Sequence, residues 1–436
     1  MSIVIPVRKP RIRIKDIINC LAVFTVFTEA LSYANIPFFE LRVSYLILLT
    51  IILLLLPFIR RFVFPMAALL FFIALIIFSL INIIAGNNNI FLLLKQCVGI
   101  IISASFFYLL IKYNGNDIKR LFLIYLNISF TVALFGIIQE AAYFMHYKPL
   151  YDLKYILPKY YLPDYYTLPY FRVSSIMPEP SAFCVAMMPA FFVSLTSILR
   201  KNFNYISFIK CLCIIIAFLL SFSTVGYMGI IITILIIAVN SQSFKNIVKY
   251  SIIAILLSAA FCFSIPDIKH RVTNSLAFFT GKCKIEETNL STYTFMQNFY
   301  VAKNVFQNSP IIGHGFGSHE LSYDRYFKKP ASPDCWQPSL NFKDANSLFL
   351  RFISETGILG LLAFIFFLIR FHLLRSKDDT GYLWVINNAI LAFFLVRLIR
   401  QGNYFSEGFF FFLWLYFFSK KSAKNSKYPH YDEYTH

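Results

Sequence analysis

The chain has 436 residues, of which 58% are hydrophobic and only 14% are charged, whereas a soluble domain carries about a quarter charged residues. Its formal net charge of +19 does not indicate nucleic-acid binding, because a protein with many membrane spans is basic mainly through its cytoplasmic loops. Apolar runs of about 18 residues or more recur along the chain and are typical of a polytopic membrane protein. The composition therefore predicts an all-α membrane protein that has membrane lipids and no nucleic acid as partners.

Membrane spans need about 20 residues each, and on that length the sequence predicts about twelve. In chain order they are Ile17–Tyr33, Val43–Ile59, Phe64–Ala85, Ile90–Ile111, Leu121–Ala142, Ser181–Leu199, Tyr205–Phe222, Gly226–Ala238, Ile247–Ile265, Ser347–Ile369, Tyr382–Ile399 and Tyr404–Phe418. Basic residues gather at alternate turns between these spans, which predicts that both termini lie in the cytoplasm. No cleavage site follows the basic N-terminal stretch, so the first span is expected to act as its own insertion signal.

Two polar segments are expected on the opposite, outer side. The chain then divides into nine spans within residues 1–265, interrupted by a short outer segment at 146–180; a large outer loop at 266–345; three spans within 346–419; and a cytoplasmic tail at 420–436, which we expect to be disordered. Apolar residues at helical spacing predict a helix at Leu290–Asn308, which lies on the membrane surface or packs on the rest of the loop.

The large loop also holds Cys283 and Cys335. In an oxidising compartment these two cysteines would pair as a disulfide. The alternative is two unpaired thiols that are too far apart to bridge.

A first candidate site lies at the outer start of the sixth span, in the stretch from Arg172 to Ser181. Glu179 stands between two prolines, so its backbone is stiff and extended. A carboxylate held there beside Arg172 could act as a general base toward a hydroxyl group. The alternative is a structural salt bridge that closes the entrance of the span.

A second candidate group consists of arginines near the outer ends of spans. Arg397 and Arg400 are spaced i, i+3, Arg271 follows the ninth span, and Arg351 lies about one turn into the tenth. Charges in this position indicate function, and guanidinium groups suit the oxygens of a lipid diphosphate. The alternatives are headgroup contact for Arg397 and Arg400, and an i, i+4 pair with Glu355 for Arg351.

A third group in the large loop contains histidines and carboxylates. Its members are His314, His319, Glu320, Asp324, Asp334 and Asp344. Their spacing matches no structural zinc pattern, so we predict neither a metal site nor another cofactor. The glycines that surround His314 allow the backbone to approach a ligand closely.

Three stretches resemble the O-antigen polymerase and ligase family of bacterial inner-membrane glycosyltransferases. Residues 172–182 are similar to its Arg-x-x-Gly-hydrophobic-x-x-Glu-Pro pattern, residues 308–317 to its Asn-Pro-hydrophobic-x-Gly-x-Gly turn, and residues 345–360 to its His-Asn-x-x-Leu segment followed by Glu-x-Gly-x-x-Gly. The turn at 221–226 is similar to its Ser-x-Ser turn. In the first pattern Ser175 replaces the glycine. In the third, Asn346 and Ser347 replace the histidine and asparagine of the ligase branch. Because an amide cannot take up a proton as imidazole can, the resemblance favours a polymerase.

The resemblance implies a GT-C-like fold and metal-independent transfer of a growing glycan from undecaprenyl diphosphate onto a new lipid-linked repeat unit, at the periplasmic face of the inner membrane. Glu179 would be the base, with His314 and His319 as weaker candidates. Arg172, Arg271, Arg397, Arg400 and Arg351 would stabilise the departing diphosphate. The resemblance also implies that a chain-length regulator protein is a possible partner of the polymerase. An O-antigen ligase acting on lipid A–core and a lipid-linked oligosaccharide flippase are the alternative functions.

Overall fold

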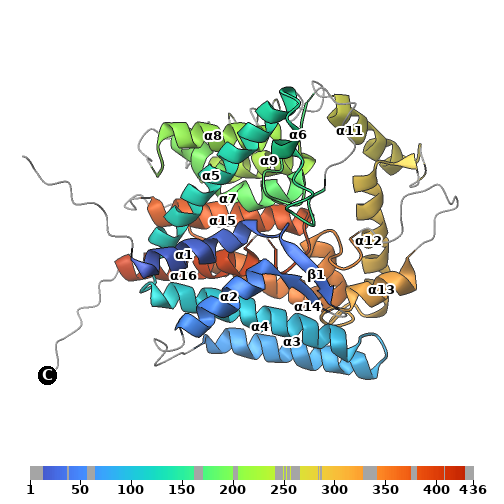
Figure 1. Ribbon diagram of the computed structural model, residues 1–436. Helices are drawn as coiled ribbons and strands as arrows, with labels where there is room; N and C mark the ends of the chain where they lie inside the picture. The colour runs from blue at the N-terminus through green and yellow to red at the C-terminus, as the bar shows by residue number, and fades with distance from the viewer. Residues whose placement is uncertain are drawn as a thin grey trace, which may run out of the picture.

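The computed structural model describes most of the chain as a bundle of apolar helices with a smaller helical layer at one end (Figure 1). The described residues are 13–36, 39–55, 64–161, 170–199, 205–240, 266–282, 284, 287–327, 341–374, 381–406 and 408–427, together with positions 249, 252 and 256.

The bundle contains the long apolar helices. They are α1 (Ile14–Phe24), α2 (Val43–Leu55), α3 (Met66–Ile84), α4 (Ile90–Tyr113), α5 (Ile118–Phe144), α7 (Pro180–Leu199), α8 (Phe208–Leu220), α9 (Thr224–Val239), α14 (Leu348–Phe371), α15 (Tyr382–Ile399) and α16 (Phe409–Lys427). The outer layer holds the antiparallel hairpin of β1 (Ser32–Ile36) and β2 (Phe39–Arg42), the short helix α6 (Lys148–Tyr151), α11 (Pro266–Phe279), α12 (Leu290–Asn308) and α13 (His319–Tyr326).

Six of these helices, α3, α4, α5, α7, α14 and α15, are long and apolar enough to cross a membrane, and α2, α8 and α9 are shorter apolar helices. All-α architecture is therefore confirmed, apart from the two-stranded hairpin. The span expected at 247–265 falls almost wholly outside the described residues. The total of about twelve spans and the GT-C-like arrangement remain predictions.

Contacts at the two ends of the bundle show that successive helices run in alternating directions. At one end, Asn19 of α1 pairs with Asn114 after α4 at 2.9 Å, and Lys420 near the end of α16 donates to the carbonyl of His372 at 2.8 Å. At the other end, Arg325 of α13 donates to the carbonyl of Gly86 in the α3–α4 turn at 3.0 Å. The start of α1 and the end of α16 thus lie opposite α12 and α13, as Figure 1 shows from left to right. We call the α12–α13 end the outer end.

The helices differ in how deeply the protein buries them. In the most apolar window of α7, 78% of the residues are buried, and in α15 67%, whereas in α3 only 17% are. α7 and α15 therefore form the centre of the bundle, and α3 lies at its edge. A buried site can therefore form at the outer start of α7 and at the outer end of α15.

Two boundaries differ from the sequence predictions. The first predicted span runs to Tyr33, but α1 ends at Phe24 because a β-branched pair follows and the Thr25 hydroxyl bonds back to the carbonyl of Ala22 at 2.6 Å. α16 continues to Lys427, so the first part of the expected disordered tail is helical. Cys283 and Cys335 lie outside the described residues, and their pairing stays a prediction.

The predicted loop helix is confirmed as α12. Tyr293 and Val301 on one side of it are fully buried, and in Figure 1 it runs across the outer end of α14, at a steep angle to the bundle helices. α12 therefore packs on α14 of the bundle as well as on α13 of the loop, so packing on the rest of the loop alone was wrong. Phe299 and Tyr300 remain exposed on another side, and contact of that side with a membrane surface stays a prediction.

Candidate functional site

The segment that leads into α7 is anchored on α5 by an amide side chain. Gln139 accepts from the backbone N–H of Ser175 at 2.8 Å and donates to the Ser175 carbonyl at 3.1 Å. Ser175 has a φ of 53°, a conformation that glycine adopts most easily, and its hydroxyl donates to the carbonyl of Val132 at 2.8 Å. This hydrogen bond gives a physical reason why serine is accepted at a position where glycine would be expected.

Glu179 stands at the end of that segment, one residue before α7, and is half-buried. Its Oε1 atom accepts hydrogen bonds from the Ser181 hydroxyl and from the Gln401 side-chain amide, the latter at 3.2 Å. The backbone N–H of Gln401 in turn donates to the carbonyl of Asn346 at 3.0 Å. Three outer segments, before α7, before α14 and after α15, therefore meet at this carboxylate.

Arg400 belongs to the same cluster. It lies just after α15, in extended backbone with φ −144° and ψ 149°, and is partly buried. Its guanidinium interacts electrostatically with Glu179 and with Asp344, and no hydrogen bond to a side chain among the described residues engages it. This guanidinium lies close to the Glu179 carboxylate, and its N–H groups can donate to a ligand. Such a group is suited to a phosphate oxygen.

Asn346 completes the cluster from the turn before α14. It has a φ of 60° and is fully buried. Its side-chain oxygen accepts from Asn341 at 3.0 Å, and its backbone N–H donates to Asp344 at 3.0 Å. Its Nδ2 group has no hydrogen-bond partner in the described structure, and a buried donor without a partner costs about 1–3 kcal/mol. Such a donor beside Glu179 and Arg400 indicates a place where a ligand binds.

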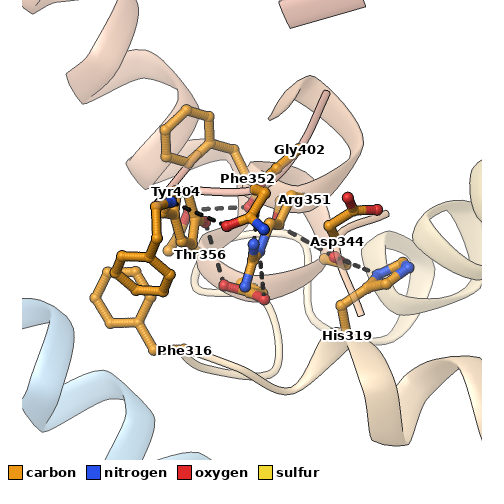
Figure 2. A network of polar contacts seen from close by, with 12 residues as sticks. Phe316, His319, Asp344, Arg351, Phe352, Thr356, Gly402 and Tyr404 are labelled. Carbon is orange, nitrogen blue, oxygen red and sulfur yellow. Dashed lines mark hydrogen bonds and ion pairs between the residues drawn. The ribbon is translucent and has the colours of Figure 1, made fainter. Parts of the chain in front are cut away.

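Arg351 forms a separate buried network one turn into α14 (Figure 2). Its Nε donates to Glu355 Oε1 at 2.9 Å and its NH1 to the carbonyl of Gly402 at 3.0 Å. The Tyr404 hydroxyl donates to Glu355 Oε2 at 3.2 Å, and the Tyr404 ring lies 4.0 Å below the guanidinium carbon. The i, i+4 pair with Glu355 is thus present, and a role for Arg351 in diphosphate binding stays a prediction.

Arg397 holds the loop that follows α15. It is fully buried, and its NH1 and NH2 groups donate to the carbonyls of Ser406, at 3.1 Å, and Asn403. Its guanidinium carbon lies 5.4 Å from the ring centres of both Phe393 and Phe409. The geometry supports a positioning role for Arg397, and direct contact with a diphosphate remains untested.

The other two predicted arginines are placed differently. Arg172 is buried and interacts electrostatically with Cys184 and Tyr227. Arg271 lies in α11, but its side chain is outside the described residues. The structure therefore brings Glu179 and Arg400 together, and the proposed grouping of all the arginines stays a prediction.

The two candidate histidines, His314 and His319, are both buried. Burial lowers the pKa of His319 to about 3 and, with help from Arg351, keeps its ring neutral. Its Nδ1 pairs with the Ser354 hydroxyl at 2.8 Å and its Nε2 with Asn298 Oδ1 at 2.9 Å. Burial, and then Arg325, lowers the pKa of His314 to about 4. Neutral rings that are buried and hydrogen-bonded to neighbours are poorly placed to take a proton from a substrate, so Glu179 remains the better candidate base.

Comparison with known proteins adds one finding to this geometry. Residues 209–365 match the model of the family described as O-antigen ligase. This part of the chain is therefore similar to the O-antigen polymerase and ligase family. No curated protein and no solved structure matches the chain. The match and the six apolar helices together indicate a membrane protein.

The family match covers nearly all of α8, all of α9, α11, α12 and α13, and most of α14. It includes Asn346 and the Arg351–Glu355 pair, whereas Glu179 and Arg400 lie outside it. The candidate site is therefore assembled partly from segments that the family model matches and partly from segments that it does not match. Gln401, Asn346 and Tyr404 were not singled out as functional side chains by the sequence. The replacement of the ligase branch's histidine by Asn346 was the one sequence feature that pointed to any of these three residues.

The two glycine-containing motifs of the family interlock. The backbone N–H groups of His314 and Gly315 donate to the carbonyls of Ser354 and Glu355 at 2.9 and 2.8 Å. This requires the helix backbone to break at Gly357, which has φ 62° and ψ −159°, a region that only glycine occupies readily. The loop that carries the histidines is thereby fixed to the helix that carries Arg351.

We expect Gly357→Ala to lower the apparent melting temperature in detergent far more than Gly115→Ala. Both glycines have positive φ, but a Cβ at Gly357 would collide with the backbone carbonyl of Ile311, whereas a Cβ at Gly115 meets nothing within 4 Å. A non-glycine residue in the left-handed helical region costs about 1–2 kcal/mol, whereas the conformation of Gly357 is one that almost only glycine adopts, so the difference measures the backbone strain and the collision at Gly357 together. Equal losses would show that the interlock does not stabilise the fold.

Proposed function

We propose that this protein polymerises undecaprenyl-diphosphate-linked O-antigen repeat units, as part of lipopolysaccharide biosynthesis, at the periplasmic face of a bacterial inner membrane. The observation that carries the proposal is the convergence of Glu179, Arg400 and Asn346, from three outer segments, at the end of the bundle opposite both described chain ends. The match to the family model supports glycosyl transfer as the reaction.

In this reaction the hydroxyl oxygen at the non-reducing end of the new repeat unit forms a bond to the anomeric carbon of the growing glycan. The bond from that carbon to the diphosphate oxygen breaks, and its electron pair leaves with the diphosphate. Glu179 takes the proton of the hydroxyl. Arg400, with Arg172 nearby, stabilises the negative charge that builds on the diphosphate, and no metal ion is needed for that neutralisation.

Asn346 supports a polymerase rather than a ligase. Its amide can donate a hydrogen bond to a sugar or phosphate oxygen, but it cannot take up a proton as imidazole can. The unpartnered Nδ2 group is already buried in the cluster, so a substrate oxygen would supply the missing acceptor. We assign the proton to Glu179, whose carboxylate accepts a hydrogen bond from the Gln401 side chain, while the backbone N–H of Gln401 donates to the carbonyl of Asn346.

The decisive experiment offers two acceptors separately to the purified protein in lipid nanodiscs. We expect a ladder of lengthened glycans when the acceptor is the lipid-linked repeat unit and no product when it is lipid A–core. Transfer to lipid A–core would establish a ligase instead. In proteoliposomes, movement of the lipid-linked oligosaccharide across the bilayer without elongation would establish a flippase.

A further inference from the structure

Gln401 contacts Glu179 but has no assigned role in the reaction. It lies one residue beyond Arg400, in the loop that follows α15, and only 8% of its surface is exposed. Its side-chain amide donates to Glu179 Oε1 and to the Ser181 hydroxyl, both at 3.2 Å. The Ser181 hydroxyl donates to the same Oε1 atom. Two side chains therefore hold one oxygen of the carboxylate.

The second oxygen of Glu179 is placed differently. Oε2 accepts no hydrogen bond from any residue that the structure describes, because both donors go to Oε1. Donors that hold one oxygen restrict rotation of the carboxylate, and they thereby fix the direction in which the other oxygen presents its lone pairs. A general base needs a lone pair within hydrogen-bond reach of the proton that it takes. The arrangement leaves Oε2 for that purpose.

The backbone of Gln401 has a conformation that glutamine rarely adopts. Its φ is 74°, in the left-handed region that favours glycine. Such a conformation persists only where the surroundings impose it, and it is concentrated at functional sites. The N–H of Gln401 donates to the Asn346 carbonyl at 3.0 Å, and the carbonyl of the next residue, Gly402, accepts from Arg351 at 3.0 Å. The turn is therefore fixed on both sides, and it links the base to Asn346.

Glycine would fit this backbone without strain, so the reason for a glutamine lies in its side chain. The hydrogen bonds of that side chain within the described structure go to Glu179 and Ser181. An amide does not exchange a proton with a hydroxyl group at neutral pH. Gln401 can therefore act on the reaction only by holding another group in place.

We propose that Gln401 is a positioning residue, which together with Ser181 fixes the Glu179 carboxylate so that Oε2 takes the proton of the acceptor hydroxyl. The inference rests on the proposed function. In the step itself the O–H bond of the acceptor breaks and its proton bonds to Oε2. The electron pair left on the acceptor oxygen forms the bond to the anomeric carbon. The diphosphate leaves with the electron pair of the bond that breaks.

The first test is Gln401→Gly in the full-length protein in nanodiscs. Since glycine fits the left-handed backbone, the melting temperature should not fall. With the carboxylate free to turn, kcat for elongation should drop about 10–100-fold, and KM for the lipid-linked acceptor should change less than about twofold. The matched control is His146→Gly, because His146 is an exposed residue with a φ of 54°. It should leave kcat unchanged.

The second test asks whether Gln401 acts through Glu179. Ser181→Ala removes the other donor to Oε1 and should give the same lower kcat with an unchanged KM. Either loss alone frees the same carboxylate, so the loss of kcat in the double variant should be smaller than the product of the two single losses. A loss equal to the product would show two independent effects and would overturn the positioning role.

The remaining outcomes are also decisive. In a wild-type protein that elongates glycans, an unchanged kcat of Gln401→Gly would overturn the proposal. A fall in melting temperature that accounts for the lost activity would assign Gln401 to fold stability and would overturn it as well. Wild-type protein that elongates no glycan would instead show that the proposed function itself has failed, and the role of Gln401 with it.

Discussion

Glu179→Gln will abolish glycan elongation while the protein remains inserted and folded. Glutamine keeps the size of the side chain and can still meet Ser181 and Gln401 through hydrogen bonds, but it cannot take a proton from the acceptor hydroxyl. Loss of a general base lowers a rate about 10²–10⁴-fold, which is enough to remove long glycans from a gel. The measurement is the glycan ladder formed by cells whose only copy of the gene carries the variant.

The matched control for this prediction is Glu287→Gln. Glu287 is an exposed carboxylate in the same outer layer, and its side chain accepts a hydrogen bond from the backbone of Lys284 at 3.0 Å. The control should leave the ladder unchanged. Long glycans in the Glu179→Gln strain, at a protein level equal to the wild type, would show that Glu179 is a structural residue and that another group accepts the proton.

The two arginines at the end of α15 should respond in opposite ways. Arg400→Ala should lower kcat about 10²–10³-fold, as does the loss of one preorganised donor to a developing anion, with little change in melting temperature. Arg397→Lys should lower the melting temperature, because one ammonium group cannot reproduce both carbonyl contacts and the stacking between Phe393 and Phe409. Activity of Arg397→Lys should fall only through displacement of the loop that carries Gln401, and not through loss of a contact with the diphosphate.

Elongation rate and melting temperature, measured on the same purified samples, separate these roles. A stable but inactive Arg397→Lys protein would show that Arg397, rather than Arg400, contacts the diphosphate. A fully active Arg400→Ala protein would mean that Arg400 only faces lipid headgroups, and its assignment to the departing diphosphate would have to be withdrawn.

The helical architecture could be predicted because its cause is local. An apolar run of about 20 residues has to satisfy its backbone within one helix when it crosses a membrane, so helices such as α3 and α4 follow from the sequence itself. The β1–β2 hairpin could not be predicted in this way. β1 begins at Ser32, inside the first predicted span, β2 lies between the first two predicted spans, and the pairing of Ser32 with Arg42 depends on both strands.

The sequence by itself determined the apolar helices and the small set of polar residues near the outer ends, because hydrophobicity and short motifs act over a few neighbouring positions. Only the tertiary structure decided what each of those residues contacts. Arg397 and Arg400 are three positions apart, yet α15 ends between them, so one guanidinium is used by backbone carbonyls and the other lies near Glu179. Hydrogen bonds between Glu179, Gln401 and Asn346 join segments far apart in the chain, and such contacts follow from how the helices pack rather than from any single stretch of sequence.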